Sequence, residues 1–193
     1  MKPLLYVLLV GALFAPGVVA TPTVDNPVDS NAAFYEGESL NYVFNPPPHF
    51  RMIGREAVND GYSFAFIPDA ARYDSTDILI GINIYKIREL DVDDVIASDT
   101  ASLRKHYGPD VIMNEVDSIS SYSGEYARTF YINSPERFLP NVMIAYIDGG
   151  TELIIFELVI SERALRFAAE EKFVSAVRNL EIMQKGRLDY GQR

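Results

Sequence analysis

The sequence predicts an α+β fold in which a central antiparallel β-sheet is flanked by helices, an α/β/α sandwich. The strongest observation is the stretch Val142 to Ile160, where two apolar runs flank Asp148-Gly149-Gly150, because paired glycines suit the tight turn of a β-hairpin. The second run is apolar on both alternating faces except at Glu152 and Glu157. A hairpin buried on both faces lies in the middle of a larger sheet, and the helical repeat of apolar residues that follows it supplies a cover.

The chain opens like a secretory signal peptide. Lys2 is followed by an apolar run and then by Val18-Val19-Ala20, the charged, apolar and small-residue order that precedes signal cleavage. A membrane anchor is the alternative, but Pro16 interrupts the run and no cationic stop follows it. We therefore expect residues 1–20 to be removed, which leaves a periplasmic or secreted protein that begins at Thr21 and has no membrane span.

The composition describes an acidic chain without cysteine. Its 193 residues include 17 Lys and Arg, 27 Asp and Glu and no Cys, which gives a formal net charge of −10. Nucleic acid and anionic lipid are bound through clustered basic residues, so neither is an expected partner. Without disulfides an exported chain relies on an ordinary hydrophobic core, which residues 39–184 are long enough to form as a single domain.

Alternating apolar patterns predict the strands. After a polar, aperiodic segment at residues 21–38, which we expect to be a flexible leader, these patterns occupy residues 40–44, 62–67, 77–87, 111–120 and 125–132. The last two are joined as a second hairpin by the turn at residues 121–124. Pro46-Pro47-Pro48 ends the first strand, because proline cannot donate to a ladder, and residues 49–59 are predicted to be a loop.

Two stretches change to helical spacing. The first is residues 91–107, with Asp91 as N-cap and Gly108-Pro109 as the stop. The second begins after Ser161, which is predicted to cap it. Its apolar stripe consists of Leu165, Ala169, Phe173, Ala176, Val177 and Leu180. Residues 185–193 are expected to be a frayed tail.

Particular residues resemble a known family. The stretches Tyr42 to Phe50, YVFNPPPHF, and Tyr62 to Pro68, YSFAFIP, followed by an Ile-rich strand, are similar to PsbP-like domains over about Leu40 to Met183. That group includes the extrinsic PsbP subunit of photosystem II, DcrB-like bacterial envelope proteins and a Ran-binding nuclear import factor. The usual Gly-Trp after the proline is here His49-Phe50. The resemblance implies an antiparallel sheet between helices and a scaffold or adaptor role without a common enzymatic activity.

Residues with catalytic or metal-binding chemistry form no recognisable motif. The two histidines, His49 and His106, are far apart in the sequence, and zinc requires three or four nitrogen or sulfur ligands. Asp91, Asp93 and Asp94 are explained by capping and by the macrodipole at a helix start. We predict no catalytic, cofactor-binding or metal-binding residue and no cofactor, although a hydrolase whose residues are assembled only by folding stays open.

One short segment has the composition of an interface. Between Pro46 and Arg55 the chain carries His49, Arg51 and Arg55 beside Phe50 and no acidic residue, and arginine with aromatic side chains is typical of binding hot spots. We predict that His49, Phe50, Arg51 and Arg55 form a partner-binding site, in which Arg51 and Arg55 contact an acidic partner or an anionic ligand. The alternative is that Phe50 packs under the sheet and the arginines only face solvent.

These observations favour an exported binding or adaptor domain of the cell envelope that is not an enzyme and that acts through a protein partner. The alternative is a carrier of a small molecule or lipid, or a hydrolase, with a pocket between sheet and helix. Fold class alone cannot decide between them, because function depends on the site that a fold carries.

Overall fold

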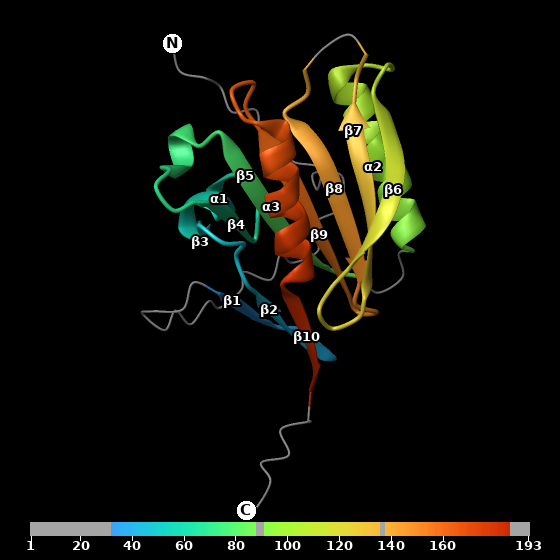
Figure 1. Cartoon of the computed structure of the whole chain (residues 1–193). Coiled ribbons are helices and arrows are strands. Elements are labelled where there is room, and N and C mark those ends of the chain that lie inside the picture. Colours follow the sequence, from blue (N-terminus) through green and yellow to red (C-terminus); the bar gives the residue numbers. More distant parts are fainter. Residues whose placement is uncertain (1–31, 88–90, 136–137, 186–193) are drawn as a thin grey trace, which may run out of the picture.

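The computed structural model describes residues 32–87, 91–135 and 138–185. The strands are β1 (Ala33–Glu36), β2 (Leu40–Phe44), β3 (Phe50–Ile53), β4 (Phe64–Pro68), β5 (Ile78–Lys86), β6 (Ile112–Ser120), β7 (Tyr126–Asn133), β8 (Asn141–Asp148), β9 (Glu152–Ile160) and β10 (Leu180–Gln184). The α-helices are α1 (Arg55–Asn59), α2 (Val92–Tyr107) and α3 (Arg166–Arg178). Figure 1 shows these elements in place.

The main sheet has seven strands in the order β3-β4-β5-β9-β8-β7-β6, and all of its pairs are antiparallel. The predicted hairpin of β8 and β9 is confirmed, with β9 at the centre of the sheet and every residue of β9 buried. A second, three-stranded sheet has the order β1-β2-β10. The predicted α+β architecture, an antiparallel sheet flanked by helices, is confirmed.

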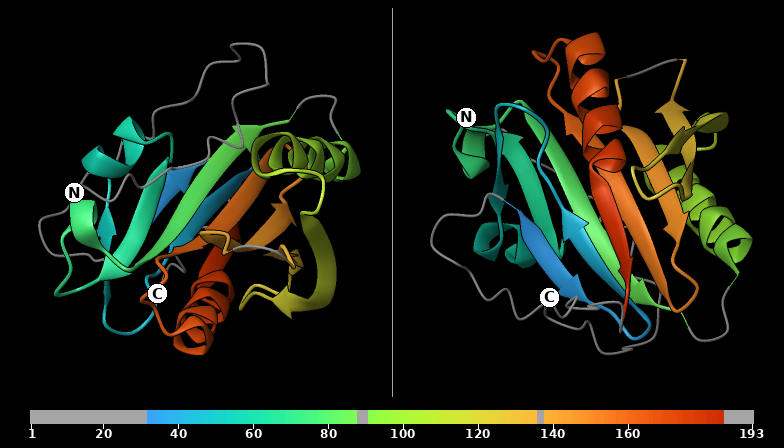
Figure 2. Two further views of the ribbon diagram at one scale, coloured as in Figure 1. Left: turned by 90° about the horizontal axis from the view of Figure 1, so that it is seen from above. Right: turned by 60° about the horizontal axis from the view of Figure 1, so that its bottom comes forward.

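The helices cover opposite faces of the main sheet. Seen from above, α3 lies on one face, and α1 and α2 lie at the two ends of the other face (Figure 2). Phe173 of α3 packs with Phe156 and Leu158 of β9 and with aromatic residues of β2 in the largest apolar cluster. The three-stranded sheet therefore helps α3 to cover its face, while Val95 and Leu103 of α2 pack on the opposite face.

The N-terminal boundary of the domain differs from the prediction. Residues 33–36, expected to belong to the leader, form β1, and Phe34 pairs with Val43 of β2. Ala33 and Tyr35 are buried and Phe34 is exposed, so a two-residue alternation is present but too short to stand out. The predicted signal peptide, the predicted leader up to residue 31 and the predicted tail from residue 186 lie outside the described residues.

The segment predicted as a loop at residues 49–59 contains β3 and α1. Phe50 N donates to Pro47 O, and His49 adopts a φ of 69°, so the three prolines reverse the chain in a tight turn. The next residues then pair with β4, Arg51 opposite Ile67. The loop prediction was wrong because the prolines end one strand without preventing the next.

The C-terminal helix is shorter than predicted. Ser161 N donates to Asp77 O, and Ser161 Oγ donates to Asp77 Oδ1 over 2.6 Å, so this serine bonds to the start of β5 instead of capping α3. Leu165 is the N-cap and is exposed. Leu180 is buried, but in β10, opposite Phe44 of β2. The prediction of buried Ala169, Phe173, Ala176 and Val177 is confirmed.

Candidate functional site

A row of polar side chains divides the apolar face that α1 and α2 cover. Along β9, Ile155 belongs to the apolar cluster under α2 and Val159 to the cluster beside α1, and Glu157 lies between them. We define the polar row as Tyr62, Asn83, Asp99, Asn141, Tyr146 and Glu157, all of them buried. Polar residues on a buried central strand are uncommon, so this row is the first candidate for a site.

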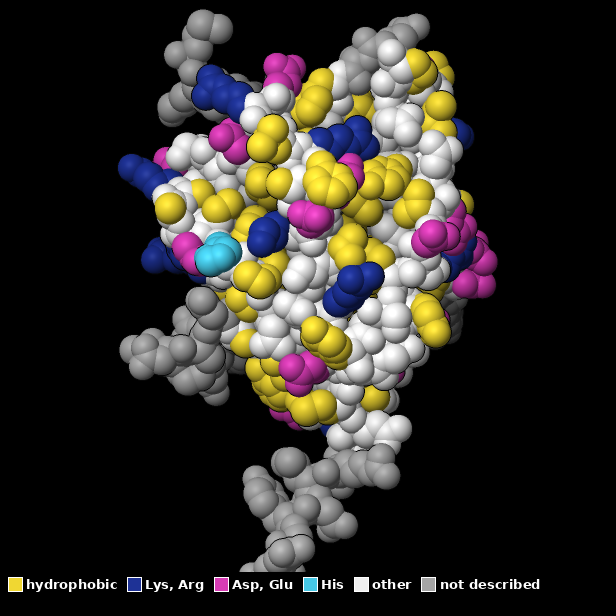
Figure 3. Space-filling model, in the orientation of Figure 1, with side chains coloured by type: hydrophobic (Ala, Val, Ile, Leu, Met, Phe, Trp, Pro, Cys, Tyr) yellow, Lys and Arg dark blue, Asp and Glu magenta, His cyan; other side chains and the backbone are white. Residues whose placement is uncertain are grey.

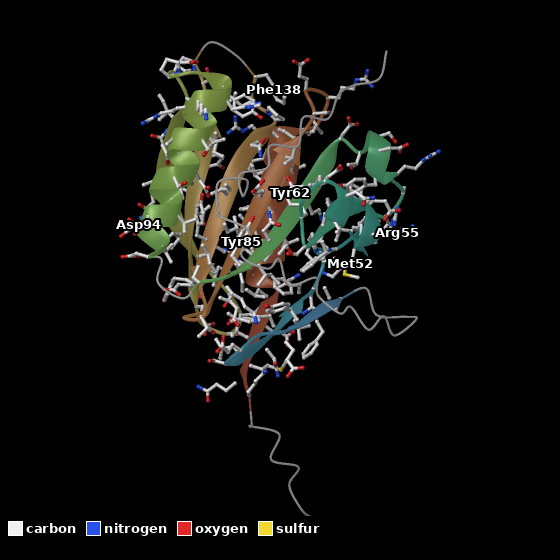
Figure 4. All side chains as sticks on the ribbon, turned by 180° about the vertical axis from the view of Figure 1, so that it is seen from behind. Met52, Arg55, Tyr62, Tyr85, Asp94 and Phe138 are labelled. Carbon is white, nitrogen blue, oxygen red and sulfur yellow. The ribbon has the colours of Figure 1, made fainter. Side chains whose placement is uncertain are left out.

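Tyr62 enters the row across a glycine. Gly81 of β5 pairs with Glu157 of β9, and a Cβ atom on Gly81 would lie 2.2 Å from Tyr62 Cε1. The Tyr62 hydroxyl then donates to Glu157 Oε2 over 3.3 Å. Figure 4 shows Tyr62 and Tyr85 on the sheet between α1 and α2. The absence of a side chain at position 81 is what lets the ring reach the central strand.

Asn141 links the same carboxyl group to α2. Its Nδ2 donates to Glu157 Oε2 over 3.5 Å, and its Oδ1 accepts from the Tyr107 hydroxyl over 3.4 Å. The register of β8 and β9 shifts between Asn141 and Met143. These are long hydrogen bonds and individually weak, so Glu157 is contacted but not tightly held.

Asp99 is the second acid of the row and comes from α2. It lies on the inner face of the helix, between Ile96 and Leu103, and only 1% of it is exposed. The Tyr146 hydroxyl of β8 donates to Asp99 Oδ2 over 2.8 Å. A carboxyl group therefore lies in the middle of the surface by which α2 packs on the sheet.

Burial changes the acidity of both carboxyl groups. It raises the pKa of Glu157 to about 8, and the nearby charge of Asp99 acts in the same direction. Burial raises the pKa of Asp99 to about 7, against the hydrogen bond from Tyr146, which lowers it. Burial also raises the pKa values of Tyr62 and Tyr146 well above their ordinary value. Near neutral pH the row can exchange protons at its two acids, while its tyrosines remain neutral donors.

Glu152, the other acid in the apolar run of β9, has a different environment on the opposite face. It accepts from Glu38 N over 2.5 Å, from the Tyr42 hydroxyl over 3.1 Å and from Thr151 Oγ1 over 2.6 Å. The bonds from Glu38 and Tyr42 fasten β2 and the preceding turn to the β8–β9 hairpin. Glu152 is therefore a structural residue. Among the described residues, Glu157 accepts two long hydrogen bonds, so it is the better candidate for a functional acid.

The predicted interface residues do not form one surface. Phe50 is buried, as the alternative reading of that segment expected. The Arg51 guanidinium donates to Asp69 O over 3.2 Å and to Ala71 O over 2.9 Å. His49 is exposed in the turn before β3, and Arg55 is exposed at the start of α1. Only His49 and Arg55 are thus exposed among the four.

A different surface carries exposed apolar side chains. Leu165 is 78% exposed and Phe167 is 74% exposed, both at the start of α3. Lys172 Nζ donates to Pro48 O over 3.2 Å, which places the turn carrying His49 beside the same helix. We call Leu165, Phe167, Lys172 and His49 the α3 face. Figure 3 shows hydrophobic side chains gathered along α3, with Lys and Arg side chains among them.

Sequence reasoning missed the most informative of these residues. Asp99 occupies a position three residues after Ile96 and four before Leu103, so helical spacing alone could have placed it on the inner face. Phe167 could not be separated from buried aromatic residues without knowing that α3 begins at Arg166. In the described part of the chain, no three or more acidic or histidine side chains converge as a metal site.

The comparisons with known proteins concern the fold. No protein-family model matches the sequence, and the search of curated proteins gave no match. The solution structure of cyanobacterial PsbP (CyanoP) from Synechocystis sp. PCC 6803 is 10% identical, and the match covers 81% of this chain and 96% of that one, with a TM-score of 0.48. The crystal structure of LpqN, involved in cell envelope biogenesis of Mycobacterium tuberculosis, is 8% identical, with 88% of this chain and 99% of that one covered and a TM-score of 0.52.

The fold is PsbP-like. The match to LpqN extends over almost the entire length of that protein and over 88% of this PsbP-like chain. At this identity the likeness concerns architecture alone, because one fold supports many functions. Among the described residues, no helix is both long enough and apolar enough to cross a membrane.

Proposed function

We propose that this PsbP-like chain is a non-catalytic binding domain of the cell envelope that holds a protein partner on the α3 face. The observation that carries the proposal is the exposure of Leu165 and Phe167, at 78% and 74%. The shared fold of LpqN, a protein of cell envelope biogenesis, and the expected signal peptide support an envelope location. The exposed apolar side chains of the α3 face support a protein partner, because a partner would bury this surface.

Hydrogen bonds hold the backbone at the start of α3. Ser161 is bonded to Asp77 at the start of β5, Arg163 N donates to Ser161 Oγ over 3.2 Å, and Ala169 N donates to Leu165 O over 3.1 Å. Apolar side chains on a fixed backbone lose little conformational freedom when a partner covers them. Phe167 is a suitable anchor, because large aromatic side chains dominate interface energetics.

The charges around this surface indicate the kind of partner. The first turn of α3 contains no acidic residue, and Arg163 and Arg166 lie on either side of Leu165. Arg166 Nε already pairs with Glu170 Oε1 over 2.7 Å, so the proposal rests mainly on Arg163 and Lys172 for its positive charge. His49 adds an imidazole beside the helix. It is the one residue that this surface shares with the interface predicted from the sequence. The partner we propose is therefore a protein whose own apolar patch is bordered by carboxylates, because opposite charges across an interface favour the correct partner.

The test replaces Leu165 and Phe167 together by Ser in the exported protein. We expect this variant to keep the wild-type melting temperature and to lose the protein that wild type retains from envelope extracts, with a Kd for the purified partner weakened at least about tenfold. Phe34→Ser is the matched control, because Phe34 is 50% exposed on β1 in the other sheet. Equal retention by all three proteins would exclude the α3 face. If the double variant instead loses self-association or vesicle binding and retains the same proteins as wild type, the α3 face binds a second copy of the chain or a lipid surface.

The polar row favours a second candidate function, a carrier whose ligand lies between the sheet and α2. Hydroxyl, amide and carboxyl groups converge there on an otherwise apolar face, as they do in many small-molecule sites. Native mass spectrometry of the exported protein tests this. A carrier would retain extra mass that Glu157→Gln reduces, whereas a protein-binding domain would show the mass of its chain alone.

A further inference from the structure

We propose that Asp99 and Glu157 act as a proton-dependent latch that holds α2 on the main sheet in acidic medium and weakens its attachment as the pH rises through neutral. The latch consists of these two acids together with Tyr107, Asn141 and Tyr146. It lies beneath a helix far from the α3 face, so it goes beyond the proposed binding function. Its failure and the failure of that function would be observed separately.

The hydrogen bonds between α2 and the sheet involve the two buried carboxyl groups. Tyr146 of β8 donates to Asp99 in the middle of the helix, and Tyr107 at the end of the helix reaches Glu157 through Asn141. The rest of the buried helix surface is apolar, with Val92, Val95, Ile96 and Leu103. A charge that appears on Asp99 must therefore be accommodated within an apolar contact, which is costly unless it is paired.

Among the residues that the structure describes, the groups that interact with the two acids are tyrosines, one asparagine and the acids themselves. Tyr85 of β5 and Tyr146 of β8 interact with both acids, and Glu157 also interacts with Tyr62, Tyr107 and Asp99. Asp60 and Tyr73 act on Tyr62 from the side of α1. In the part of the chain that the structure describes, neither acid forms an ion pair. Ionisation of one acid therefore opposes ionisation of the other.

The direction of the pH effect follows from the raised pKa values. Asp99 has a pKa of about 7 in the folded protein against an ordinary 3.8, and Glu157 has about 8 against 4.5. Between the ordinary and the folded values the folded protein binds more protons than the unfolded chain, so stability falls as pH rises. The contribution is complete below about pH 4 and is lost once the pH passes through 7 to 8.

The experiment measures the melting temperature and amide hydrogen exchange of the exported protein at pH 5 and pH 8.5. We expect wild type to melt several degrees lower at pH 8.5, with amide protection, taken relative to the intrinsic exchange rate at each pH, falling first in α2. Asp99→Asn and Glu157→Gln imitate the protonated acids, so each should melt close to wild type at pH 5 and above it at pH 8.5. Asp94→Asn is the matched control, because Asp94 is exposed on the same helix, and it should keep the wild-type pH dependence.

Two results would overturn the latch. One is that Asp99→Asn and Glu157→Gln retain the full wild-type loss of stability between pH 5 and pH 8.5. The other comes from wild type alone and does not depend on the variants folding. Carbon-detected NMR titration of the side-chain carboxyls should give midpoints near neutral pH for the two buried acids, and midpoints below about pH 5 for both would contradict the proposal.

Discussion

The ring of Tyr62 lies across Gly81 so closely that a Cβ atom at position 81 would lie 2.2 Å from Tyr62 Cε1. This contact carries the Tyr62 hydroxyl to Glu157, the partner of Gly81 on the neighbouring strand. Gly81 adopts no left-handed backbone angle, so the glycine serves packing and not a turn. The polar row therefore depends on a residue that has no polar group.

The first prediction is that Gly81→Ala destabilises the domain by about 1 to 3 kcal/mol, the usual cost of overpacking a core. The methyl group would displace the Tyr62 ring and lengthen its hydrogen bond to Glu157. Chemical denaturation of both proteins measures the change. Gly54→Ala is the control, because a Cβ at position 54 meets nothing within 4 Å. Equal losses for the two variants would show that backbone freedom, and not the Tyr62 ring, explains the effect.

The second prediction compares two phenylalanines of α3. Phe173 is fully buried and Phe167 is 74% exposed. Phe173→Asp should remove the cooperative melt, because an unpaired charge in the core costs several kcal/mol. Phe167→Asp should shift the melting temperature by no more than a few degrees. A cooperative wild-type-like melt of Phe173→Asp would mean that this side of α3 does not face the sheet.

The central hairpin was predictable because its determinants are local. Paired glycines interrupt two long apolar runs, and Gly149 N donates to Glu152 O to close the turn. Only Gly150 has a positive φ. Gly149 is required for another reason, since a Cβ there would lie 2.3 Å from the Tyr42 hydroxyl. The sequence pattern thus predicted the turn correctly. The requirement for glycine at position 149, however, comes from the packing of Tyr42 of β2 against the turn.

The elements that sequence reasoning missed depend on distant partners. β10 forms because Leu180 and Ile182 pair with Phe44 and Tyr42, about 140 residues earlier in the chain. Read alone, Leu180 fitted the helical stripe that precedes it. The same limit applies to the site, because helical spacing can place Asp99 on an inner face, but only the folded chain shows that Tyr146 and Glu157 meet it there.

The third prediction concerns export. The order of residues around Val18-Val19-Ala20 predicts that the mature protein begins at Thr21. N-terminal sequencing of the protein recovered from the envelope or the medium measures this directly. A main product that keeps Met1 would contradict cleavage and remove the basis for an extracytoplasmic location.

The fourth prediction separates two arginines that the sequence placed in one interface. The Arg51 guanidinium donates to the backbone oxygens of Asp69 and Ala71, so it fastens β3 to the segment after β4. Arg55 is exposed at the start of α1. Arg51→Glu should lower the free energy of unfolding by about 1 to 3 kcal/mol, because two hydrogen bonds from a charged donor are lost. Arg55→Glu should change it by less than about 0.5 kcal/mol.

Binding distinguishes the same two residues in the opposite way. If Arg55 contacts an acidic partner, Arg55→Glu should weaken retention of that partner and make the remaining binding less sensitive to salt, since a favourable charge contact is replaced by repulsion. Arg51→Gln is the informative companion, because it removes the charge and keeps a hydrogen-bond donor near Ala71. Unchanged retention by Arg55→Glu at low and high salt would remove Arg55 from the interface, leaving His49 as the remaining exposed residue among the four predicted contacts.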